Sequence, residues 1–147
     1  SNFSKLVATA NDFNRLRPEC RERINIPCGV SNATKTLSFA SGLGTGSLLS
    51  SDGDVTIQCV KIDEVLLDFR PNLIKMDIEG AELDALHGCR RTIERLRPGL
   101  AICIYHKPDD LWTIPFAIRD MVSNTGKYYI RSHCYNGFEF VLYWQPD

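Results

Sequence analysis

The spacing of apolar positions changes along the chain, and each change marks the boundary of an expected element. Apolar residues three and four positions apart predict helices. Short runs rich in β-branched and aromatic residues predict strands. The expected helices cover residues 3–16, 62–67, 82–96 and 111–121, and the expected strands cover residues 24–28, 34–39, 55–61, 73–76, 100–105, 128–133 and 138–144.

The order of these elements predicts an α/β fold, because strand, helix, buried strand and helix follow one another over residues 73–121. The strand over residues 100–105 is almost purely apolar, as in a parallel sheet that is covered on both faces. Asn136-Gly137 separates the last two strands and predicts an antiparallel hairpin. A length of 147 residues suits one domain. We therefore expect a single three-layer α/β domain over residues 1–147, with helices on both faces of its sheet.

Charge and hydropathy narrow the choice of partners. Lys and Arg number 17 against 18 Asp and Glu, so the chain has no basic excess for binding nucleic-acid phosphates. The longest apolar stretch, residues 99–105, is far shorter than the roughly 20 residues of a membrane-spanning helix. We expect neither a nucleic-acid partner nor a membrane partner.

The cysteines predict a reducing environment. None of the six is spaced as CxxC, and most lie inside apolar runs that resemble strands. This pattern favours reduced core residues of a cytoplasmic protein over a disulfide framework or a zinc site. The cysteines are Cys20, Cys28, Cys59, Cys89, Cys103 and Cys134.

Polar residues follow two of the expected strands abruptly and mark a candidate site. Asp77 ends the strand over residues 73–76, and Glu79 and Glu82 follow it across Gly80. His106 follows the strand over residues 100–105, so it should face the same edge of the sheet as Asp77. A histidine there can take a proton from a substrate hydroxyl, or it can simply cap its strand. Glu82, and also Glu79, can be explained as helix-start residues that the helix dipole favours.

A glycine-rich stretch, Gly42-Leu43-Gly44-Thr45-Gly46, imitates the turn that binds a dinucleotide or an adenosyl group. Such a turn must open a helix of ten or more residues, and residues 47–54 contain poor helix formers. We therefore expect a mobile loop over the site. The sequence also lacks the GxSxG and GxxxxGK[ST] patterns, which argues against a hydrolase or a phosphate-loop protein.

The stretch Lys75-Met76-Asp77-Ile78-Glu79-Gly80-Ala81-Glu82 resembles the signature of the FkbM-type methyltransferases, which are class I enzymes that use S-adenosylmethionine. Similarity continues through Ile104-Tyr105-His106-Lys107-Pro108 and upstream through Pro27-Cys28-Gly29-Val30. The resemblance implies a Rossmann-like sheet with the strand order 3-2-1-4-5-7-6. It also implies methyl transfer, with a hydroxyl of a small-molecule or sugar-like acceptor as the expected target.

Compared with the family pattern, the chain lacks two features. Family members begin with a strand ending in a glycine-rich turn and a second strand ending in an acidic residue, and neither lies before residues 2–16. We expect this chain to lack the first two strands and the first helix of the family fold. The remaining strands would then have unpaired edges, and we expect a homo-oligomer formed through them.

The resemblance also implies residue roles. Asp77 and Glu79 would lie near the reacting methyl group, with His106 beside them, and these three are the candidate catalytic residues. Cys28, Gly29 and Val30 would lie against the adenine of S-adenosylmethionine, with Asp77 as a further cofactor contact. Asp77 could also contribute to a divalent metal site, but the sequence assigns no second ligand. The alternative function is an inactive α/β remnant that acts as a binding or oligomerisation module.

Overall fold

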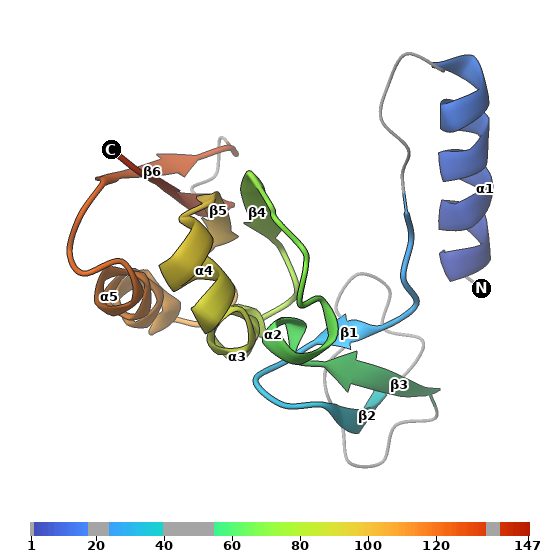
Figure 1. The fold of residues 1–147 in the computed structure, drawn as a ribbon, viewed down its shortest axis with the longest axis horizontal. Coiled ribbons are helices and arrows are strands. Elements are labelled where there is room, and N and C mark those ends of the chain that lie inside the picture. Colours follow the sequence, from blue (N-terminus) through green and yellow to red (C-terminus); the bar gives the residue numbers. More distant parts are fainter. Residues whose placement is uncertain (1, 18–23, 40–54, 135–138) are drawn as a thin grey trace.

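The computed structural model describes residues 2–17, 24–39, 55–134 and 139–147 (Figure 1). The stretch 42–46 and the turn at Asn136-Gly137 lie outside the described residues. The helices are α1 (Asn2–Leu16), α2 (Ile62–Val65), α3 (Glu82–Gly88), α4 (Arg90–Leu96) and α5 (Asp110–Met121). The strands are β1 (Gly29–Val30), β2 (Lys35–Phe39), β3 (Val55–Val60), β4 (Leu73–Met76), β5 (Gly99–Cys103), β6 (Lys127–Ser132) and β7 (Phe140–Gln145).

The described strands form two sheets. The larger one has the order β4-β5-β7-β6, in which β4 and β5 are parallel and the C-terminal strands are antiparallel. This order is the second half of the order that the family resemblance implies. The smaller sheet has the order β1-β3-β2, and β2 and β3 form the expected antiparallel pair. The α/β fold class and the C-terminal antiparallel pair are therefore confirmed.

The strand expected over residues 24–28 is wrong. Only Gly29 and Val30 form strand pairs there, and they pair in parallel with Cys59 and Val60 at the end of β3. Ile24 and Ile26 are exposed, and no neighbouring strand pairs with them in the described part of the chain. An apolar run with β-branched residues therefore predicted a strand where none of the described strands pairs with the backbone.

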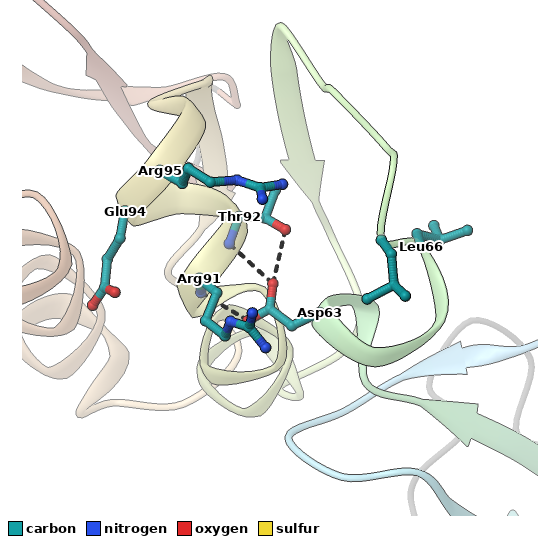
Figure 2. A pocket seen from close by; sticks show the side chains of 7 residues that line it. Asp63, Leu66, Arg91, Thr92, Glu94 and Arg95 are labelled. Carbon is teal, nitrogen blue, oxygen red and sulfur yellow. Dashed lines mark hydrogen bonds between the residues drawn. The ribbon is translucent and has the colours of Figure 1, made fainter.

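The helix expected over residues 82–96 is two helices that meet at Cys89. The new helix α4 leaves free backbone N–H groups at its start, and Asp63 of α2 accepts those of Arg91 and Thr92 at 2.7 and 3.0 Å. The hydroxyl of Thr92 also donates to Asp63 (Figure 2). Gly88 at the end of α3 allows the helix to approach Ser31 closely, since a Cβ atom there would lie 2.1 Å from the carbonyl oxygen of Ser31. A side chain far away in sequence therefore caps α4.

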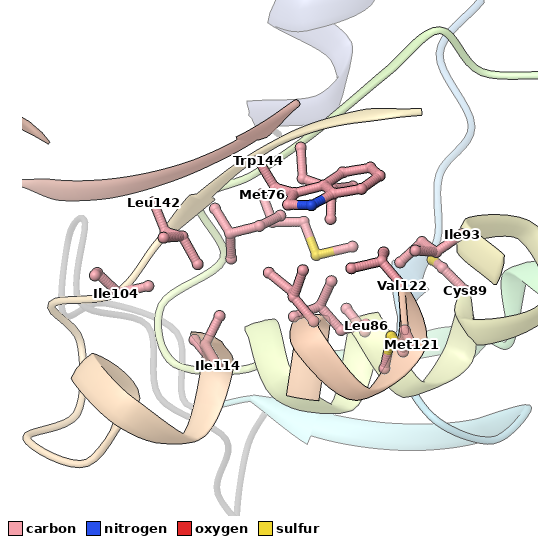
Figure 3. Close-up of a cluster of buried hydrophobic side chains, with 14 residues drawn as sticks. Met76, Leu86, Cys89, Ile93, Ile104, Ile114, Met121, Val122, Leu142 and Trp144 are labelled. Atoms are coloured by element: carbon pink, nitrogen blue, oxygen red, sulfur yellow. The ribbon is translucent and has the colours of Figure 1, made fainter. Parts of the chain in front are cut away.

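The main core lies between the larger sheet and α3, α4 and α5. Figure 3 shows Met76, Leu142 and Trp144 of the sheet facing Leu86 and Ile114 of the helices. The opposite face of this sheet carries a small cluster of Ala101, Cys103 and Val141 with two tyrosines, and a shallow cavity of about 490 Å³. We expected helices on both faces of the sheet. Within the described residues, helices cover only one face of the larger sheet (Figure 1).

No described helix combines the length and the apolar character needed to cross a bilayer.

Candidate functional site

The candidate site lies where β4 and β5 end. The two strands are parallel, with Met76 opposite Ile102, so the segments that follow them leave the sheet at the same edge. Asp77 follows β4 directly, and His106 lies three residues beyond the end of β5. Their side chains meet, with Oδ1 of Asp77 3.5 Å from Nε2 of His106. The structure thus brings together two residues that sequence reasoning placed at this edge.

The turn after β4 adds Glu79 to the site. Glu79 and Gly80 both have left-handed backbone angles, with φ of 57° and 90°. Oε2 of Glu79 lies 3.6 Å from Nε2 of His106. Gly80 is required here, because its φ is positive and a Cβ atom would lie 3.1 Å from the side chain of Lys107, whose amine donates to the Gly80 carbonyl oxygen. All three candidate catalytic residues therefore meet around one imidazole nitrogen.

Glu82 has a larger part in the site than its sequence position suggested. Its side chain is fully buried, although it is the first residue of α3. Oε1 accepts the N–H of Ile78 at 2.8 Å and lies 2.9 Å from Nδ1 of His106. The sequence signal for this inward position was weak, because an acidic residue in the first turn of a helix is favoured for electrostatic reasons alone. We call Asp77, Glu79, Glu82 and His106 the strand-end cluster.

Two further side chains next to Asp77 were missed from the sequence. The hydroxyl of Tyr105 donates to Oδ1 of Asp77 at 3.3 Å, and the tyrosine ring lies against His106 with centroids 4.2 Å apart. Partial burial, followed by the negative charge of Asp77, raises the pKa of Tyr105 to about 12. Tyr105 therefore remains a neutral hydrogen-bond donor at physiological pH. Burial, and then Asp77, similarly raise the pKa of the Cys103 thiol to about 12.

Asp110 holds the segment that carries His106. Its carboxylate accepts the N–H of Lys107 at 3.0 Å, and its side chain is buried at the start of α5. Burial raises the pKa of Asp110, and the nearby charge of Glu82 acts in the same direction. Asp110 therefore fixes the backbone next to His106 and adds a fourth carboxylate beside the strand-end cluster.

The residues predicted to contact adenine are only partly brought to this edge. Val30 lines a small apolar cavity of about 150 Å³ together with Met76 and Ile78, which flank Asp77. Gly29 instead packs against Cys59, since a Cβ atom on Gly29 would lie 2.7 Å from the cysteine sulfur. Cys28 is half-buried. Val30 is thus the one of the three whose described contacts reach the residues around Asp77.

The described cysteines are free thiols, and Cys20 lies outside the described residues. Cys59, Cys89 and Cys103 are buried, as expected for reduced core residues, whereas Cys134 is exposed. The expectation of a core position is therefore wrong for Cys134, because this residue lies beyond the end of β6 and not within a strand.

Another cavity, of about 360 Å³, lies between α2 and α4 and is lined by Asp63, Arg91 and Arg95 (Figure 2). Its one buried carboxylate, Asp63, is already bonded to α4. Asp63 therefore has a structural role in capping α4, and the strand-end cluster is the better candidate for a catalytic site.

Comparison with known proteins agrees with the fold and the signature. Residues 9–129 match the methyltransferase FkbM domain. A crystal structure of methyltransferase FkbM from Methylobacillus flagellatus KT is similar, with 27% sequence identity and a TM-score of 0.71. The match covers 95% of this chain and 33% of that one, so this chain spans about a third of the length of its structural relative. Comparison with curated proteins gives no significant match. The matched domain covers most of the sequence, and the chain belongs to the FkbM methyltransferase family.

Proposed function

We propose that this chain is part of an enzyme that transfers a methyl group from S-adenosylmethionine to a hydroxyl of a small-molecule or sugar-like acceptor. Family membership supports methyl transfer as the reaction. The convergence of Asp77, Glu79 and His106 on one edge of the sheet supports a hydroxyl as the acceptor, because a hydroxyl has to lose a proton during the reaction. This convergence is the observation that carries the proposal.

The proposed roles follow from the reaction. When bound, S-adenosylmethionine supplies a methyl group on a cationic sulfur, and in-line attack by the acceptor oxygen forms a C–O bond as the C–S bond breaks. Asp77 and His106 would hold the hydroxyl in line, and the cluster of Asp77, Glu79 and His106 would take up its proton. Catalysis of this kind depends mainly on alignment, which suits side chains fixed at the ends of two rigid strands.

The donor site can be judged from the residues present. The apolar cavity beside Val30, Met76 and Ile78 suits the apolar faces of an adenine ring. The family pattern places the methionine and ribose contacts on two strands that the resemblance did not find in these 147 residues. We therefore propose that this chain supplies the acceptor side and the adenine side of the site, and that further chain supplies the other donor contacts.

Calorimetric titration with S-adenosylhomocysteine tests this division. The chain of 147 residues and a version of the natural protein extended at the N-terminus would be titrated in parallel, with ATP as a control ligand. We expect saturable binding by the extended version only. Binding of S-adenosylhomocysteine by neither version would contradict the proposed function. Tight binding by the 147-residue chain would contradict the proposal that further chain supplies donor contacts. Residues 42–46 would then become the candidate donor site.

Self-association is a second proposal, which also bears on the alternative of a binding or oligomerisation module. Among the described strands, β4 pairs with β5 alone, and Leu73 at its start is 63% exposed. An open strand edge with apolar side chains favours pairing with another chain. We expect light scattering to report a dimer for the 147-residue chain and a shift towards monomer for Leu73→Lys. A monomer at all accessible protein concentrations would contradict this proposal.

A further inference from the structure

Within the described part of the chain, two buried side chains of the strand-end cluster have polar atoms without hydrogen-bond partners. Oε2 of Glu82 is buried and forms no hydrogen bond. The imidazole of His106 is only 8% exposed, and neither of its ring nitrogens forms a hydrogen bond. Nδ1 lies 2.9 Å from Oε1 of Glu82, but this contact does not meet the angular requirement of a hydrogen bond. Buried polar atoms are nearly always satisfied in native proteins, so these atoms call for a binding partner.

The spacing of the ligand atoms fits a metal ion. Asp77, Glu82 and His106 each offer one ligand atom, and the three atoms lie within 4.8 Å of one another. The 3.5 Å between Nε2 of His106 and Oδ1 of Asp77 is too long for a hydrogen bond. It is close to the roughly 3.0–3.5 Å expected between two neighbouring ligands that each lie about 2.1 Å from one ion. The three residues come from the ends of β4 and β5 and from the start of α3, which fixes their positions.

The charge around these atoms is strongly negative. Asp77, Glu79, Glu82 and Asp110 are close together, and Glu82 and Asp110 are buried. Two lysines lie beside these carboxylates: the amine of Lys75 is 3.9 Å from Asp77, and the amine of Lys107 donates to the Gly80 carbonyl oxygen. Both lysines are exposed, so each contributes little. A buried carboxylate such as Glu82 is costly unless a cation balances it. A bound cation would balance these carboxylates and would also bind one of the two free imidazole nitrogens of His106.

The geometry points to a binding site for a divalent transition-metal ion, formed by Asp77, Glu82 and His106. One imidazole and two carboxylates favour an ion such as Mn²⁺ or Zn²⁺ over Mg²⁺, which prefers oxygen ligands alone. Only the use of the ion rests on the proposed function. In that enzyme the ion would bind the acceptor hydroxyl and ease its deprotonation, with the exposed carboxylate of Glu79 close enough to receive the proton.

Metal titration of the untagged 147-residue chain, after treatment with a chelator, tests the site. Calorimetry and Mn²⁺ electron paramagnetic resonance should report one Mn²⁺ site per chain, and Zn²⁺ should compete for it. We expect Mg²⁺ to bind about tenfold more weakly or worse. Asp77→Asn and Glu82→Gln should each weaken Mn²⁺ binding by about tenfold or more, whereas Asp109→Asn should change it by less than about twofold.

The variants are chosen to remain folded. The side chain of Asp77 is 42% exposed, and the amide oxygen in Glu82→Gln can still accept the N–H of Ile78. Asp109 is exposed, and its replacement removes the same charge close to the site without removing a ligand. Circular dichroism would verify the fold of each variant before titration.

The inference would be overturned if the folded chain bound neither Mn²⁺ nor Zn²⁺, or if Asp77→Asn and Glu82→Gln bound Mn²⁺ as the wild type does. The metal site and the proposed function can fail separately. If the 147-residue chain binds the metal but the extended version does not bind S-adenosylhomocysteine, only the proposed function is contradicted. If the extended version binds S-adenosylhomocysteine but the chain binds no metal, only the metal site is contradicted.

Discussion

If the proposed function holds, replacing Asp77 with asparagine is expected to slow methyl transfer by about 100-fold or more, because the variant loses the carboxylate proposed to act on the acceptor hydroxyl. The asparagine side chain would keep nearly the same shape and could still accept the hydrogen bond from Tyr105. The loss should therefore appear mainly in kcat rather than in KM for the methyl donor. The measurement is transfer of a radiolabelled methyl group from S-adenosylmethionine to a hydroxylated acceptor of the proposed class, by the version extended at the N-terminus.

The matched control for this experiment is Asp109→Asn, which removes the same charge from an exposed position next to α5. Its rate should stay within about twofold of the wild type, because the exposed Asp109 is not a member of the strand-end cluster. A rate for Asp77→Asn within about threefold of the wild type would remove Asp77 from the catalytic machinery.

Leu86→Ala is expected to lower the free energy of unfolding by about 2–5 kcal/mol, because it removes a buried side chain and leaves a cavity. Leu86 is fully buried on α3, in the core that joins this helix to the larger sheet (Figure 3). Urea denaturation followed by circular dichroism would measure the change. Since α3 also carries Glu82, loosening its packing should disturb the strand-end cluster as well.

The exposed Leu67 provides the comparison for this core substitution. It is 65% exposed, so Leu67→Ala should change the free energy of unfolding by less than about 0.5 kcal/mol. A loss below about 1 kcal/mol for Leu86→Ala would mean that the core repacks around the missing side chain.

Much of the larger sheet could be predicted from the sequence, because its signals are local. The strands around residues 73–76 and 100–105 and the helix over residues 111–121 correspond to β4, β5 and α5. The break at Cys89 could not be predicted, since it depends on Asp63, which lies 28 and 29 residues before the amides it binds. The strand expected over residues 24–28 had the right composition and no strand partner in the described part of the chain.

The candidate site shows the same division between local and long-range information. Asp77 and His106 could be placed together because parallel strands end at the same edge of a sheet. The burial of Glu82 depends on how α3 packs against the sheet, and no local pattern distinguishes an inward glutamate from one that only begins a helix. The grouping of Asp77, Glu82 and His106 as possible metal ligands could therefore be recognised only from the structure.

The left-handed backbone of Glu79 has a consequence for how this site can evolve. A residue with a side chain in that conformation costs about 1–2 kcal/mol relative to the right-handed region, and β-branched residues tolerate it worst. Glycine, asparagine and aspartate should therefore be the readily accepted replacements at position 79. Replacement of Glu79 by glycine or asparagine would retain the turn while removing its charge, so the carboxylate can be lost there without a change in the backbone.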